Sequence, residues 1–79
     1  MTSCSLGNLQ LTVKEAKNKT ELILFRLTGK RTSLGQEILE EISRFQINGS
    51  LEDRREDILY WLSINGAERL IRLFQLMVI

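Results

Sequence analysis

The sequence predicts an all-α protein, a small bundle of four short helices. Apolar residues recur at spacings of three and four along most of the chain, which is the period of an α-helix. Ser or Thr precedes several of these apolar stretches, as expected where a helix begins, and the chain contains no proline to interrupt one. The helices are expected over residues 12–28, 34–47, 51–64 and 67–78, with short connections.

At 79 residues, the chain has the length of one domain near the lower size limit for a single hydrophobic core. Its 43% hydrophobic and 27% charged content is that of an ordinary globular protein. Residues 1–11 are rich in Ser, Gly and Asn and are expected to form a loosely ordered N-terminal lead. Residues 12–79 are expected to form a single helical domain.

The first helix is predicted from a capping box, in which Thr12 and Glu15 would bond each other's backbone amides. Gly29 follows as a stop signal. The alternative is a β-hairpin followed by three helices, because residues 9–13 alternate between apolar and polar. In that alternative, residues 9–14 pair with residues 21–28. The helix is preferred because its capping, charge-pair and stop signals agree.

The second helix is predicted to begin after Ser33 and to end at Asn48-Gly49. It has one apolar stripe, formed by Leu34, Ile38, Leu39, Ile42 and Phe45. Ser50 is expected to cap the third helix, which has acidic residues in its first turn. Five consecutive large apolar or aromatic residues follow at 58–62, and they cannot all face one core.

The fourth helix, residues 67–78, is apolar on all but a narrow arc and would need to be buried on most of its sides. In a chain this short, the other helices can pack against only one side of it. The sequence therefore predicts self-association, most simply as a homodimer through the third and fourth helices. The residues expected at the interface are of types enriched at interface centres or lie on the apolar arc: Tyr60, Trp61, Leu70, Leu73, Phe74, Met77 and Ile79.

Enzyme chemistry is not supported by the sequence. The chain has no histidine, and Cys4 is its single cysteine, so a zinc site lacks its usual ligands. The acidic residues occur in clusters that also contain arginines, as expected of solvated, ion-paired surfaces. We therefore predict no catalytic residue, no metal and no cofactor, and a protein that is not an enzyme.

The formal net charge is only +1, but the charges are unevenly distributed. Residues 1–33 carry six cations and two acids, whereas residues 34–57 carry seven acids and three cations. Such a dipolar chain fits a protein-interaction module, which would act as an adaptor, assembly factor or modulator of another protein. The alternative is a small nucleic-acid-binding regulator. Its anion or nucleic-acid contacts would be Lys14, Lys17, Lys30 and Arg31.

An intracellular, cytoplasmic location is expected. The first residues lack the basic and apolar regions of a signal peptide, and no apolar run approaches the roughly 18 residues that a membrane span needs.

Overall fold

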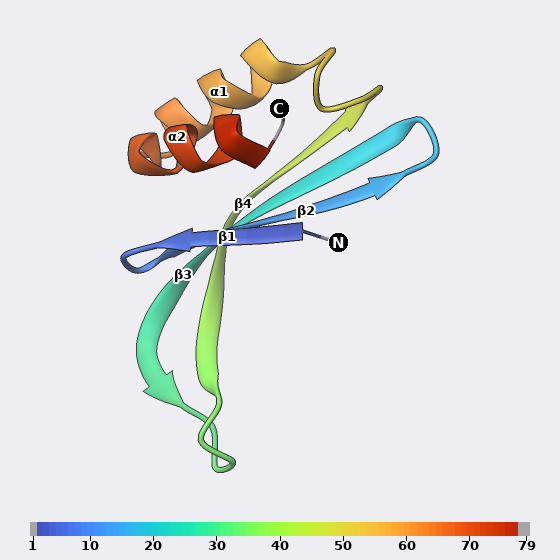
Figure 1. Cartoon of the computed structure of the whole chain (residues 1–79). Coiled ribbons are helices and arrows are strands. Elements are labelled where there is room, and N and C mark those ends of the chain that lie inside the picture. The colour runs from blue at the N-terminus through green and yellow to red at the C-terminus, as the bar shows by residue number, and fades with distance from the viewer. Residues whose placement is uncertain (1, 78–79) are drawn as a thin grey trace.

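The chain forms a four-stranded antiparallel β-sheet followed by two α-helices (Figure 1). The computed structural model describes the backbone of residues 2–77 and the side chains of residues 2–76. In chain order the elements are β1 (Thr2–Leu6), β2 (Leu9–Ala16), β3 (Lys19–Arg31), β4 (Glu37–Asn48), α1 (Arg55–Ile64) and α2 (Glu68–Met77).

The prediction of an all-α bundle is therefore wrong. Residues 12–28 form part of β2, a tight turn and most of β3, and residues 34–47 lie mainly in β4. The hairpin alternative has the pairing of β2 with β3 right, since Leu9 lies opposite Arg26 and Ala16 opposite Lys19. It is wrong about β4, which it made a helix. The segment expected as a loose lead contains β1 and the start of β2.

The four strands follow one another in space in the order of the sequence, so each pair is joined by a hairpin. The β2–β3 hairpin turns through Lys17 and Asn18, and Asn18 has a φ of 61°. Asparagine is one of the few non-glycine residues that tolerate this left-handed conformation. This local turn chemistry fixes the register in which β2 and β3 pair.

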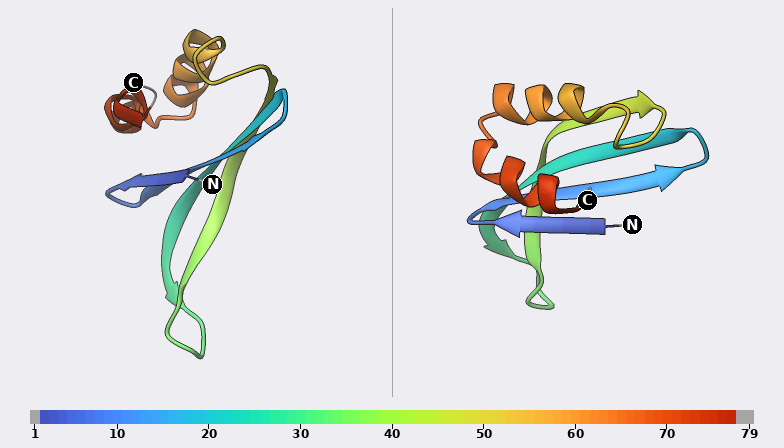
Figure 2. Two further views of the ribbon diagram at one scale, coloured as in Figure 1. Left: turned by 45° about the vertical axis from the view of Figure 1, so that its right-hand side comes forward. Right: turned by 45° about the horizontal axis from the view of Figure 1, so that its top comes forward.

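Both helices pack on the same face of the sheet (Figure 2). The alternating residues of the strands supply one wall of the core, and one side of each helix supplies the other. Trp61 anchors α1, because its Nε1 donates to Ser43 Oγ at 3.0 Å and its ring meets that of Phe45 edge-on at 5.5 Å. The core residues are Leu11, Val13, Leu22, Leu24, Ile47, Ile58, Trp61, Leu62, Ala67, Leu70 and Phe74.

The opposite face of the sheet is not covered by α1 or α2, yet its centre is shielded. Ile23 is 3% exposed and Thr12, directly opposite it on β2, is 6% exposed. On the other side of Ile23 lies Arg44, held between Glu21 at 3.2 Å and Glu41 at 2.6 Å. Ile23 is therefore a buried apolar residue with the ion-paired Arg44 as its neighbour on the adjacent strand.

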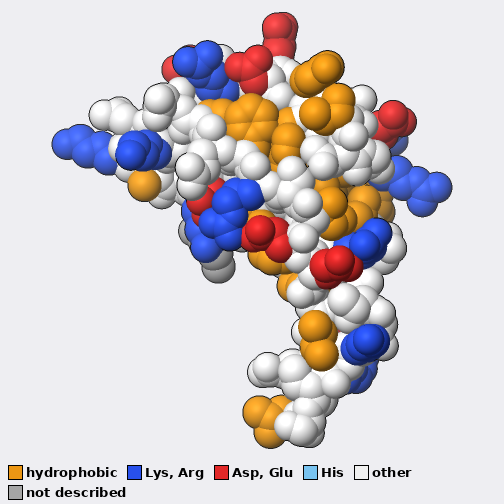
Figure 3. Space-filling view, turned by 180° about the vertical axis from the view of Figure 1, so that it is seen from behind, with side chains coloured by type: hydrophobic (Ala, Val, Ile, Leu, Met, Phe, Trp, Pro, Cys, Tyr) orange, Lys and Arg blue, Asp and Glu red, His pale blue; other side chains and the backbone are white. Residues whose placement is uncertain are grey.

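The ends of β3 and β4 extend beyond the rest of the sheet as a two-stranded arm, which we define as residues 27–39 (Figures 1 and 3). The pairing of β3 with β2 ends at Arg26, whereas its pairing with β4 continues to Arg31, which lies opposite Glu37. A β-bulge precedes the arm, because Leu24 lies opposite Ser43 but Phe25 lies opposite Glu41. Ile42 is the extra residue.

Candidate functional site

The residues predicted from sequence to mediate self-association do not form one accessible surface. Leu70 and Phe74 are fully buried and Trp61 is 5% exposed, all three in the core. Leu73 is half-buried against that core, and Tyr60 is 69% exposed on the outer side of α1. The side chain of Met77 and the whole of Ile79 lie outside the described residues. The apolar surplus of the C-terminal half is thus used largely to cover the sheet.

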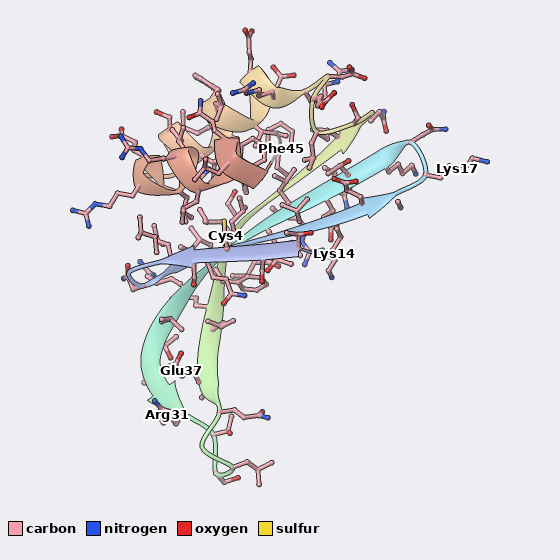
Figure 4. All side chains as sticks on the ribbon, in the orientation of Figure 1. Cys4, Lys14, Lys17, Arg31, Glu37 and Phe45 are labelled. Carbon is pink, nitrogen blue, oxygen red and sulfur yellow. The ribbon has the colours of Figure 1, made fainter. Side chains whose placement is uncertain are left out.

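The four residues predicted to contact an anion or nucleic acid lie near opposite ends of β3, and Figure 4 labels three of them, Lys14, Lys17 and Arg31. Lys14 and Lys17 lie at the β2–β3 hairpin, whereas Lys30 and Arg31 lie in the arm. A 13-residue strand is about 40 Å long, so the two pairs cannot bind one small ligand together. Arg31 is also engaged locally, by Glu37 at 3.5 Å and by the backbone oxygen of Gly35 at 2.9 Å.

The outer edge of β4 is the first candidate interaction surface. β4 is the last strand of the sheet, so its outer backbone groups face no other strand of the described chain. Leu34, at the tip of the arm, is 86% exposed. Ile38, Leu39 and Ile42 are exposed by 39%, 36% and 37%. A free strand edge flanked by exposed apolar side chains is a template for pairing with another chain.

The charges on β4 limit how another strand could pair with it. Glu40 bonds Arg26 on β3 at 3.0 Å, and Glu41 bonds Arg44 within β4. These pairs are exposed and contribute little to stability. The order of the charges along β4 matters more for strand pairing, because the acidic residues come before the bulge and Arg44 comes after it. A strand that pairs with β4 must match this change of sign.

The second candidate surface is a groove of about 510 Å³ beside the β2–β3 turn. Most of its side chains come from the sheet face opposite the helices, in two rows that cross three strands. One row consists of Ala16, Lys19 and Asn48, and the other of Lys14, Glu21 and Gln46. Thr20 and Ile47 complete the lining.

Glu21 is the acidic group of this groove, and its carboxylate is already engaged by neighbouring side chains. It accepts a hydrogen bond from Gln46 Nε2 at 2.6 Å and forms an ion pair with Arg44 at 3.2 Å. The hydrogen bond from Gln46, followed by the positive charges of Arg44 and Lys14, lowers the pKa of Glu21 below its ordinary value. Hydrogen bonds to Glu41 and Glu21 in turn raise the pKa of Arg44. Glu21 and Arg44 therefore both remain ionised at neutral pH.

Among the described residues, no group of three or more His, Cys, Asp or Glu side chains lies close enough together to hold a metal ion. Cys4 is half-buried on the helix-covered face of the sheet (Figure 4), and burial raises the pKa of its thiol. A raised pKa keeps the sulfur protonated at neutral pH and therefore unreactive. Neither helix described here is long and apolar enough to cross a membrane.

No protein family, curated protein or solved structure matches the chain. Its function must therefore be argued from its own surfaces. The sequence analysis did not single out Lys19, Gln46 or Asn48 as groove residues, because the hairpin that brings them together was only its alternative. It placed the exposed residues of the arm in the buried stripe of a helix. Gly29 and Gly35, both with positive φ in the arm, were the local signal for a hairpin there.

Proposed function

We propose that the protein is a non-enzymatic interaction module that self-associates as a homodimer through the outer edge of β4. The observation that carries this proposal is the free edge of a 12-residue strand flanked by exposed apolar side chains. Pairing with a second β4 would satisfy the unpaired backbone groups and cover part of that apolar surface. The dimer would contain one continuous eight-stranded sheet, four strands from each copy.

The charges disfavour some registers for such a pair. A two-fold axis at Glu40 or at Glu41 would place a glutamate against its own copy, which is destabilising. A two-fold axis at Ile42 instead places this exposed apolar side chain against its own copy and sets no acidic residue of β4 opposite another.

Site-directed crosslinking tests this register. We use a Cys4→Ser background, which removes the one native thiol, and introduce Ile42→Cys. Residues that face each other across an antiparallel pair have Cα atoms about 4.5–5.5 Å apart, within the range that a disulfide spans. Mild oxidation should therefore link two copies. Tyr60→Cys in the same background is the matched control, because Tyr60 is exposed on α1 and is not part of the β4 strand.

Two results would contradict the proposal. The first is a monomeric mass by light scattering at every protein concentration tested, with no crosslink through Ile42→Cys. The second is efficient crosslinking through Tyr60→Cys alone, which would return the interface to the helices.

Two further parts of this proposal rest on the sequence alone. The first is a role as an adaptor, assembly factor or modulator of another protein, and the second is an intracellular, cytoplasmic location. The alternative function, a nucleic-acid-binding regulator, has less support than before, because its four expected contacts lie at the two ends of β3. Its remaining support is the groove that contains Lys14 and Lys19.

A further inference from the structure

We propose that the groove beside the β2–β3 turn binds a phosphate group. This proposal does not depend on self-association, since the groove is lined by the opposite end of the sheet from the arm. Its volume of about 510 Å³ is within the range of small-ligand sites.

The charge of the groove favours an anion. Arg44 is shared by Glu21, at 3.2 Å, and Glu41, at 2.6 Å, so it balances one of these two carboxylates. Lys14 and Lys19 both line the groove, and within the described chain neither forms an ion pair shorter than 4 Å. Together with Arg44, the two lysines outnumber the two carboxylates, so this part of the surface carries a net positive charge that attracts an anion.

The positions of the two lysines suit one phosphate. Lys14 lies opposite Glu21, and Lys19 is two residues before Glu21 on β3. They are therefore diagonal neighbours on one face of the sheet, with Cα atoms about 7–8 Å apart. Lysine side chains are long enough to bring both ammonium groups to a single phosphate from that separation.

The number of cations and the remaining lining favour phosphate over carboxylate. A phosphate group carries up to two negative charges and has three acceptor oxygens, so it can receive hydrogen bonds from both ammonium groups, and lysine binds phosphate as a point charge. The arginine next to the groove, Arg44, is already held by two glutamates. Asn48, directly opposite Lys19, supplies an amide for a further hydrogen bond.

The phosphate could belong to a free nucleotide or to the backbone of a single-stranded nucleic acid. We would titrate the full chain with inorganic phosphate, with ADP and with a single-stranded oligonucleotide, and follow the backbone amide resonances by NMR. In each productive titration, the shifts should concentrate at Lys14, Lys19 and Asn48. Binding should weaken with added salt, because the contacts are between exposed charges.

Lys14→Gln combined with Lys19→Gln should weaken binding at least about tenfold, since charged hydrogen bonds are lost. The matched control is Lys30→Gln combined with Arg31→Gln, which removes the same charge from the arm and should leave the affinity unchanged. Binding of ADP would assign the site to nucleotides. Binding of the oligonucleotide alone, lost in the groove variant, would assign it to a nucleic-acid backbone. Shifts with none of the three probes, or equal losses in both double variants, would overturn the proposal.

Discussion

Phe74 gives the most direct test of where the apolar residues of α2 are used. Its side chain is fully buried in the core of one chain, between the sheet and the helices. Phe74→Ala should therefore destabilise the fold itself. If Phe74 belonged to an interface between two copies, the same substitution would release folded monomers.

The expected loss is large for a protein of this size. Truncation of a buried Phe to Ala costs about 3–5 kcal/mol. A chain of 79 residues has a total stability of roughly 4–12 kcal/mol, from about 0.05–0.15 kcal/mol per residue. The variant should lose about a quarter or more of that stability. At about 4–8 °C per kcal/mol, its melting temperature should fall by roughly 12 °C or more.

Thermal and urea unfolding, followed by circular dichroism, measure this loss. The decrease in stability should be the same over about a hundredfold range of protein concentration, because it arises within one chain. Tyr60→Ala is the control, since Tyr60 is 69% exposed and its truncation should change stability by no more than about 0.5 kcal/mol. If Phe74→Ala cannot be purified, the fully buried Ile58 allows a milder change, Ile58→Val, which should cost about 0.5–1.5 kcal/mol. A Phe74→Ala protein that keeps the wild-type melting temperature but halves its mass would refute this reasoning.

Three further predictions concern single contacts. Trp61→Phe and Ser43→Ala each remove the indole–hydroxyl hydrogen bond of 3.0 Å, so a double-mutant cycle in urea should give a coupling of about 0.5–1.5 kcal/mol; additive losses would contradict it. Asn18→Val should destabilise the β2–β3 turn by about 1–2 kcal/mol, and Asn18→Gly should not, because only the branched residue is strained at a φ of 61°. The pKa of Glu21 is lower when folded than its ordinary value of 4.5, so its contribution to stability is complete above that pH and is lost as the pH falls through the folded pKa. Unfolding measured from pH 7 to pH 3 should therefore show a smaller acid-induced loss for Glu21→Gln than for the wild type, and parallel curves would contradict this.

The two helices were more predictable from sequence than the strands. The helix expected over residues 51–64 begins at Arg55, after a turn in which the amide of Asp53 donates to Ser50 Oγ at 3.2 Å. The helix expected to follow it is α2, Glu68–Met77. Both helices have charged residues in their first turn, and Gly66 lies between them. These signals depend only on neighbouring residues, and such local signals are the ones that a single sequence shows best. The burial of Phe74 and Trp61 was not predictable, because it depends on a sheet that the sequence analysis did not foresee.

In β3, the obstacle was burial on both faces. Leu22, Ile23 and Leu24 are consecutive and all buried, two of them under the helices and Ile23 on the other face, opposite Arg44. Alternation between apolar and polar residues identifies a strand only when one face is exposed. Without that alternation, the apolar spacing of residues 13–27 also fitted a helix.

In β4, the bulge at Ile42 explains why the spacing of the apolar residues was interpreted as that of a helix and not of a strand. After the bulge, Ser43 and Phe45 face the core on odd-numbered positions. Before it, Glu40, opposite Arg26, occupies the same face on an even-numbered position. One inserted residue thus shifts the alternation by one, and a shifted period of two resembles spacings of three and four. The same bulge leaves Glu40 and Arg44 on opposite faces of the sheet, with the exposed Ile42 between them in the chain. In the proposed dimer, a second copy of β4 centred on Ile42 would therefore meet an apolar side chain and not a like charge.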